Sequence, residues 1–333
     1  MIIIGIPASN SSTPTDIAIA HTTTPYVTAY KWRQGFQTKY SDPATLPTGT
    51  GRSVKFKPQR DAVAVVHDTS PYVTAYPWSS GFGSKYADPA TVPTGVGQGV
   101  AFSNNGNDLA VSHQISPYIS VYPWSAGFGT KYSNPATLPA STGLDVTFTT
   151  NNNTIAVAHD VSPYISVYPW SSGFGSKYAN PATLPTGTGR SVDFNSANDV
   201  IAVGHSTSPY ISVYAWSAGF GTKYADAATT PTGDGSGVAF SPSGDSLIVA
   251  HSITPFVTAY PWSAGFGTKY ANPATLPAGT GTRVAFAPLG DAVGISHATS
   301  PFISTYPWNA GFGTKYANPA TGVAGIGRGV DYV

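Results

Sequence analysis

The sequence contains no cysteine and no glutamate, and charged residues make up only 9% of its 333 residues. Without cysteine the chain can form no disulfide, no thiolate nucleophile and no cysteine-ligated zinc site. Glutamate, lysine, arginine and leucine sustain helices, and their scarcity favours a fold built from strands. The 36 glycines and 29 prolines agree with many short strands joined by turns.

The net charge is only +1, so no strong field would draw the protein to nucleic acid or to an anionic membrane. Residues 1–7 have no basic region, and their apolar run is too short for a signal peptide. No stretch is long enough to span a membrane. We therefore expect no nucleic-acid partner, no membrane insertion and no secretion signal, and the localisation stays open between a virion and the cytoplasm.

Every histidine and every tryptophan recurs at an interval of 46 residues. Five further columns, headed by Tyr26, Tyr30, Phe36, Tyr40 and Phe56, contain all 20 tyrosines and all 15 phenylalanines. Such a fixed period is typical of repeat architectures. The two invariant columns are His21, His67, His113, His159, His205, His251 and His297, and Trp32, Trp78, Trp124, Trp170, Trp216, Trp262 and Trp308.

Seven units without insertion or deletion fill the chain from residue 12 to its last residue, and residues 1–11 form an N-terminal extension. We interpret the rest as a single domain. Its repeats are 12–57, 58–103, 104–149, 150–195, 196–241, 242–287 and 288–333.

One copy shows how the unit should fold. Alternating residues predict strands at 237–241, 247–251 and 256–262, with a turn at 242–245 and a short fourth strand at 268–270. In the second strand one face is branched and the other is small, as with Ile17 and Ile19 against Ala18 and Ala20. Four antiparallel strands per unit, packed bulky face to small face, predict an all-β, seven-bladed β-propeller.

The segment Val238-Ala239-Phe240-Ser241-Pro242-Ser243-Gly244-Asp245 resembles the opening of a WD40-type repeat. The resemblance covers residues 12–333 and implies a propeller of the highly repetitive kind found in phage and bacterial proteins. After the first two strands the sequence departs from that family. Tyr260-Pro261-Trp262 stands where the family has its Trp-Asp pair, so its usual hydrogen-bond network does not carry over.

The chain begins its first unit at a second strand, so one blade needs an inner strand from elsewhere. We predict that residues 329–333 supply it and close the ring. The alternative is that residues 2–6 fill this place.

The histidine column suggests a metal site, but neighbouring rings should lie ~10 Å apart. Ligands of one metal must each lie roughly 2.0–2.1 Å from it. We therefore expect no metal and no cofactor. We expect each histidine to be buried and hydrogen-bonded to the adjoining Ser/Thr-Pro loop, at Ser70, Ser116, Ser162 and Thr254.

Two other columns have competing interpretations. The tryptophans could staple the blades or stack on sugars, with Trp124, Lys131 and Asn134 as one such site. The lysines could protect a sheet edge or bind an anion. This column is Lys39, Lys85, Lys131, Lys177, Lys223, Lys269 and Lys315.

If the protein binds one unique ligand, the ligand must contact positions that break the sevenfold repeat. The alternative is that these positions vary neutrally because they are exposed. On the first strand, beside the expected channel, these are Lys55, Asp145, Asp193, Arg283 and Asp331. At its entrance they are Arg52, Gln98, Leu144, Arg190, Ser236, Thr282 and Arg328. The loops after the histidines vary too, as in Asp68-Thr69, Gln114-Ile115 and Asp160-Val161.

Since every histidine is repeated seven times and the aspartates lie mostly in turns, the sequence favours a non-catalytic protein. We expect a monomeric scaffold that binds a protein partner through these loops or the channel mouth. The alternative is a multivalent, lectin-like binder of glycans, possible for a phage receptor-binding component.

Overall fold

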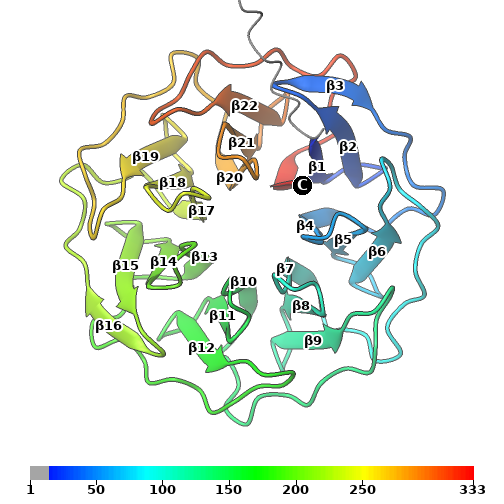
Figure 1. The fold of residues 1–333 in the computed structure, drawn as a ribbon, viewed down its shortest axis with the longest axis horizontal. Coiled ribbons are helices and arrows are strands. Elements are labelled where there is room, and N and C mark those ends of the chain that lie inside the picture. The colour runs from blue at the N-terminus through cyan, green and yellow to red at the C-terminus, as the bar shows by residue number, and fades with distance from the viewer. Residues whose placement is uncertain (1–14) are drawn as a thin grey trace, which may run out of the picture.

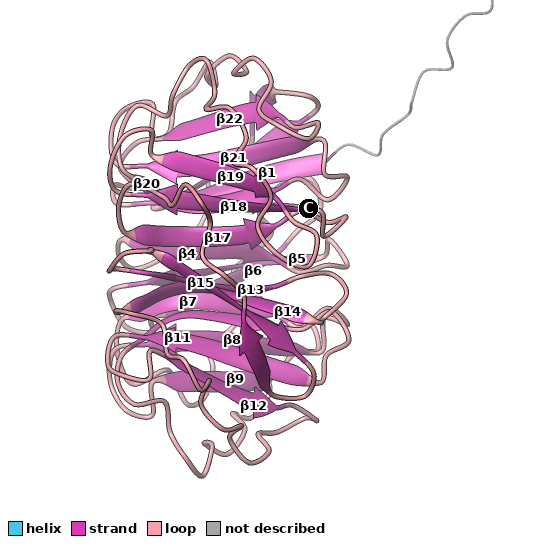
Figure 2. Ribbon diagram, turned by 90° about the vertical axis from the view of Figure 1, so that its left-hand side faces the viewer, coloured by secondary structure: helices cyan, strands magenta, loops and turns pink. Residues whose placement is uncertain are grey.

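In the computed structural model, described here over residues 15–333, seven antiparallel sheets surround a central axis as the blades of a propeller (Figure 1). Figure 2 shows the disc edge on, with the strands crossing its thickness. Each blade has an inner, a middle and a third strand, and two blades have a fourth. The all-β, seven-bladed fold predicted from the repeat is confirmed.

Blade 1 is the sheet β23-β1-β2-β3, and blades 2 to 7 follow in chain order. The inner strands are β4 (Gly51–Phe56), β7 (Gly97–Phe102), β10 (Gly143–Phe148), β13 (Gly189–Phe194), β17 (Gly235–Phe240), β20 (Gly281–Phe286) and β23 (Gly327–Tyr332). The middle strands are β1 (Thr15–His21), β5 (Ala62–His67), β8 (Asp108–His113), β11 (Thr154–His159), β14 (Val200–His205), β18 (Ser246–His251) and β21 (Ala292–His297). The third strands are β2 (Val27–Trp32), β6 (Val73–Pro77), β9 (Ile119–Pro123), β12 (Ile165–Pro169), β15 (Ile211–Trp216), β19 (Val257–Pro261) and β22 (Ile303–Pro307), and the fourth strands are β3 (Phe36–Lys39) and β16 (Phe220–Lys223).

The fourth strand forms only in blades 1 and 5, so the predicted strand at 268–270 is absent. There Trp262 pairs with Phe266 in a single bridge. The cause lies at one position of the third strand, which is Lys31 in blade 1 and Ala215 in blade 5 but proline in the other five blades. Proline has no N–H to donate to an outer strand, so the ladder stops after one bridge.

The C-terminal strand closes the ring, as predicted. β23 pairs antiparallel with β1, with Ile17 opposite Tyr332 and Ile19 opposite Val330. Asp16 and Val333 exchange two backbone hydrogen bonds of 3.0 Å. The competing segment, residues 2–6, lies outside the described residues.

Neighbouring blades pack as the alternation predicts. Ala18 and Ala20 of blade 1 contact Val63 and Val65 of blade 2 within one buried cluster. Because each middle strand is buried on both faces, six similar clusters follow around the ring. Packing between the blades therefore constrains the size of the side chains on the middle strands.

Candidate functional site

Each inner strand has a β-bulge near its start, at the residue predicted to lie at the channel entrance. In blade 2, Gly51 pairs with His67 and Ser53 with Val66, so Arg52 stays outside the ladder. A Cβ atom at Gly51 would collide with the Tyr26 carbonyl oxygen, so this bulge needs glycine. Bulges commonly redirect a side chain. The seven bulge residues all line one mouth of the channel: Arg52, Gln98, Leu144, Arg190, Ser236, Thr282 and Arg328.

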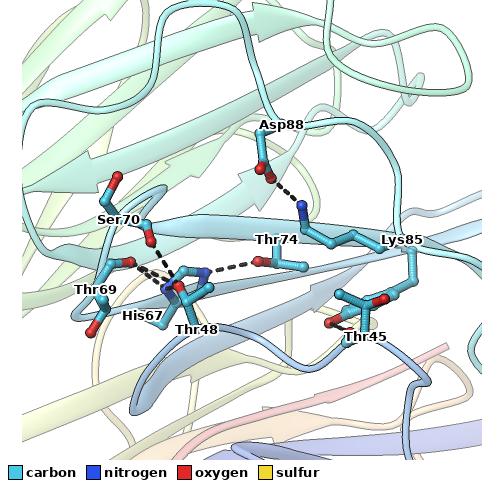
Figure 3. A network of polar contacts seen from close by, with 9 residues as sticks. Thr45, Thr48, His67, Thr69, Ser70, Thr74, Lys85 and Asp88 are labelled. Carbon is cyan, nitrogen blue, oxygen red and sulfur yellow. Dashed lines mark hydrogen bonds and ion pairs between the residues drawn. The ribbon is translucent and has the colours of Figure 1, made fainter.

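The middle strands end in histidine at this same mouth, and we call this side of the disc the histidine face. The His67 ring is fully buried, with Nδ1 2.8 Å from the Thr69 carbonyl oxygen and Nε2 2.9 Å from the Thr74 hydroxyl (Figure 3). Because a carbonyl only accepts, Nδ1 carries the proton and Nε2 accepts from threonine. Burial lowers the pKa of His67 to about 4, so the ring is neutral at pH 7.

All seven histidines are fully buried and bond through Nε2 to a hydroxyl seven residues ahead, on the third strand. The predicted loop contact is confirmed in blades 2 and 4, where Nδ1 lies 2.8 Å from the Thr69 carbonyl oxygen and 2.7 Å from that of Val161, but Ser70 and Ser162 are not the partners. In blade 2 the hydroxyl comes from Thr74, whereas Ser70 contributes its carbonyl to the Thr48 hydroxyl. The repeat carries the signal, since a serine or threonine follows each histidine at this distance: Thr28, Thr74, Ser120, Ser166, Ser212, Thr258 and Ser304.

The tryptophans are buried, with 2–6% of their surface exposed. Trp78 makes edge-to-face contacts with Tyr40 of blade 1 and with Phe56 and Phe82 of its own blade, at centroid distances of 4.9–5.2 Å. A ring enclosed in this way has no free face for a sugar. The interpretation of the tryptophans as sugar-stacking platforms is therefore wrong, and they staple the outer parts of adjacent blades.

Two aspartates strengthen this staple, and sequence reasoning missed them. Asp16 on β1 accepts hydrogen bonds from Trp78 Nε1 at 3.0 Å and from the Tyr40 hydroxyl at 2.7 Å. Asp108 makes the same pair of contacts with Trp170 and Tyr132. Only blades 1 and 3 have aspartate at this position, so a search for residues repeated in every blade does not find it.

The lysine column lies at the rim of the disc. Each lysine bonds to an Asp or Asn three residues later, as Lys39 does to Asp42 at 2.5 Å and Lys269 to Asn272 at 2.5 Å. Lys131 and Asn134, which were considered as contacts for a sugar, likewise form a hydrogen bond with each other. Each ammonium group therefore already has a partner in its own blade, which agrees with the interpretation that the lysines protect the sheet edge.

Along the channel the predicted aspartates hold neighbouring inner strands together. Asp331 accepts a hydrogen bond from the Phe56 amide at 2.8 Å and pairs with Lys55 at 2.7 Å. Asp193 accepts from the Phe240 amide at 2.9 Å, and burial raises its pKa to about 7. Asp145 accepts from the Ser191 hydroxyl at 2.8 Å and from the next amide at 3.1 Å.

Arg283 reaches across the channel and separates two cavities. Its guanidinium donates to the carbonyl oxygens of Ser236, Thr282 and Leu144. On one side lies a cavity of about 310 Å³ that contains Lys55 and the three aspartates of the inner strands. On the other, at the histidine face, lies a cavity of about 320 Å³ lined by arginines. The twelve channel positions predicted from the sequence therefore divide between two chambers of different charge, and Arg283 lines both.

The loops after the middle strands carry exposed apolar side chains on the histidine face. Ile115 is 56% exposed, Val161 49% and Ile253 55%. All three stand two residues after a histidine, where the other four repeats have threonine. Isolated exposed aliphatic residues are common, but three at one repeat position on one face mark an asymmetric surface.

Comparison with known proteins supports the fold alone. No family model and no curated protein matches the sequence. Among solved structures, a protein from Lactobacillus plantarum is 13% identical with a TM-score of 0.72, covering 96% of this chain and 99% of its own. The periplasmic gluconolactonase of Pseudomonas aeruginosa is 13% identical with a TM-score of 0.71, covering 96% and 99%.

The Swd1 β-propeller domain of Myceliophteria thermophila is 12% identical with a TM-score of 0.59, covering 82% of this chain and 88% of its own. These likenesses place the chain among the β-propellers. Within the described part of the chain, no helix is long and apolar enough to cross a membrane.

Proposed function

We propose that this β-propeller is a non-catalytic binding protein that engages a protein partner through its histidine face. The observation that carries the proposal is the trio of exposed apolar residues, Ile115, Val161 and Ile253. The repeat would allow threonine at each position, as it does in four blades. Solvent-exposed aliphatic side chains at equivalent positions are typical of a surface that becomes buried when another molecule binds.

The partner that fits is a protein segment with apolar side chains spaced to meet loops of blades 3, 4 and 6. Full burial of one such side chain contributes roughly 1.5–3 kcal/mol, so the three side chains together would contribute a substantial share of the free energy of binding. Association would occur with little change in the propeller, because every loop root is fixed by a buried histidine.

A selection from a displayed library of 12-residue peptides, with the full-length chain immobilised, tests this function. We expect enrichment of sequences rich in aliphatic and aromatic residues. The enriched pool should lose binding to an Ile115→Thr, Val161→Thr, Ile253→Thr variant and keep it for Leu289→Ser. Leu289 is 64% exposed on the opposite face, where another repeat has Ser243. A pool without enrichment, or one equally weakened by Leu289→Ser, would refute the proposal.

Absence of catalysis is part of the proposal, and the roles of the channel acids support it. Each aspartate of the inner strands already accepts an inter-blade hydrogen bond. Because the structurally similar propellers include the gluconolactonase of Pseudomonas aeruginosa, the sharpest check is hydrolysis of gluconolactone and 6-phosphogluconolactone. We expect no rate above that of buffer, and saturable turnover abolished by Asp193→Asn would contradict this.

We further propose that the protein acts as a monomer of the highly repetitive, WD40-like kind, in a virion or in the cytoplasm. Glycan binding is retained only as an outcome of the test. A glycan array showing saturable binding while the peptide selection fails would replace the protein partner with a carbohydrate.

A further inference from the structure

The cavity at the histidine face, which we call the arginine chamber, is unusual in its charge. Four of its nine lining residues are arginines, Arg52, Arg190, Arg283 and Arg328, and no acidic residue lines it. In a chain with only 16 basic residues, this is a marked concentration. Three of the four arginines come from adjacent inner strands, β20, β23 and β4.

The nearby acids do not neutralise these arginines. Among the described residues, Arg190 alone of these four has an ion-pair partner, Asp234 at 3.1 Å. Arg52 bonds to the neutral Gln98 amide at 3.4 Å, and Arg283 bonds to backbone carbonyls. Arg328 is exposed and has no hydrogen-bond partner among residues 15–333. Arg52, Arg283 and Arg328 therefore share one chamber, and none of them forms an ion pair within residues 15–333.

Two further features show unmet binding capacity. The Nε atoms of Arg52 and Arg190 are buried without a hydrogen-bond partner within the described chain. Partial desolvation at the channel mouth and the nearby charges of Arg52 and Arg283 lower the pKa of Arg328. Gathering cations in this way is unfavourable unless an anion compensates for it.

We propose that the arginine chamber binds a small polyanion with at least two negative charges on phosphate or carboxylate groups. Guanidinium groups recognise both groups through paired hydrogen bonds. A cavity of about 320 Å³ accommodates a compact ligand of this kind. The site goes beyond the proposed partner surface, because it uses the bulge residues at the channel mouth and not the apolar loops.

Isothermal titration calorimetry on the full-length chain tests the site, with tripolyphosphate and citrate as probes in separate arms. Acetate at matched ionic strength serves as the monovalent control. We expect saturable binding of at least one polyanion with a single site and no binding of acetate. A tenfold preference for tripolyphosphate over citrate would identify a phosphate ligand, and the reverse preference a carboxylate ligand.

The variants come from the repeat itself. Arg52→Gln and Arg328→Ser introduce the residues found at the same position in Gln98 and Ser236, so both should fold. Together they should weaken binding at least tenfold. The control, Lys31→Gln with Arg33→Gln, removes two exposed charges at the rim of blade 1 and should change affinity less than twofold.

Absence of saturable binding in both polyanion arms would overturn the proposal, as would equal weakening by the rim control. If the double variant is unfolded, the two single variants should each weaken binding at least threefold, and unchanged affinity in both would also overturn it. The peptide selection uses the apolar loops alone, so failure of one proposal is distinguishable from failure of the other.

Discussion

The guanidinium of Arg283 donates a hydrogen bond from Nη2 to the Leu144 carbonyl oxygen, 3.2 Å away on the other side of the central channel. The two residues belong to β20 and β10, which face each other across the axis in Figure 1. One side chain thus separates the arginine chamber from the cavity that holds the aspartates. A single departure from the sevenfold repeat, at Arg283, thus divides the central channel in two.

Replacing Arg283 should join the two cavities at little cost in stability. Arg283→Ser introduces the residue that blades 2 and 5 have at this position, Ser53 and Ser191. The released carbonyls can bond to channel water, so we expect the free energy of unfolding to change by less than about 1 kcal/mol. Urea denaturation measures this, and a crystal structure shows the merged channel. A loss above about 3 kcal/mol would mean that Arg283 holds the ring together.

Stability should fall steeply in mild acid. Burial lowers the pKa of all seven histidines to about 4, against an ordinary value of 6.5. Below pH 6.5 the unfolded chain therefore binds more protons, and stability is lost as the pH falls toward 4. Each buried ring would lower the free energy of unfolding by on the order of 3 kcal/mol once the pH has fallen to about 4. Even a third of this, over seven rings, is comparable with a typical total stability of roughly 5–15 kcal/mol.

The channel carboxylates act in the opposite direction but are fewer. Burial raises the pKa of Asp193 to about 7 and also raises that of Asp331, so these groups bind protons more readily in the folded state. Calorimetric melting between pH 7.5 and 4.5 gives the balance. We expect Tm to decrease steadily as the pH falls from 6.5 to 4.5. A Tm that stays constant down to pH 5 would contradict the assigned histidine environment.

Loss of Asp108 should destabilise the fold through its two unsatisfied donors. Asp108→Ala leaves Trp170 Nε1 and the Tyr132 hydroxyl without their acceptor, at a cost of about 1–3 kcal/mol. Thr154→Ala is the matched control, because it removes a side chain at the same position of blade 4 that contacts no tryptophan nitrogen. Chemical denaturation compares the two, and equal losses would show that the carboxylate has no special role.

Removal of the C-terminal strand should open the ring. A truncation that ends at Gly327 deletes most of β23, which exposes the inner edge of β1 and the buried Ile17 and Ile19. We expect a decrease in Tm of more than 10 °C and association in size-exclusion chromatography. An unchanged Tm would indicate that another segment can close blade 1.

Much of the fold was accessible from sequence because the repeat supplies seven aligned copies of each position. The pairing of alanine with branched faces, the buried histidines and the closing strand all follow from residues in register. The missing fourth strand was also encoded, in the proline that replaces Lys31 and Ala215, but its effect depends on which side of the third strand the absent N–H would face.

The site was accessible only in part. Sequence reasoning identified the residues that break symmetry, but it could not separate clamps such as Asp145 from unpaired groups such as Arg328, since this depends on side-chain reach across blades. Asp16 and Asp108 were missed because their tryptophan partners lie 62 residues away, in the next blade.

The central claim is that function lies in the positions that depart from the repeat. The affinity of the best selected peptide for the Ile115→Thr, Val161→Thr, Ile253→Thr variant tests this most directly, since the variant only restores the residue present in Thr69 and its equivalents. We predict an unchanged Tm and at least tenfold weaker binding than to the parent chain. Equal affinity for the parent and this symmetrised variant would contradict the claim.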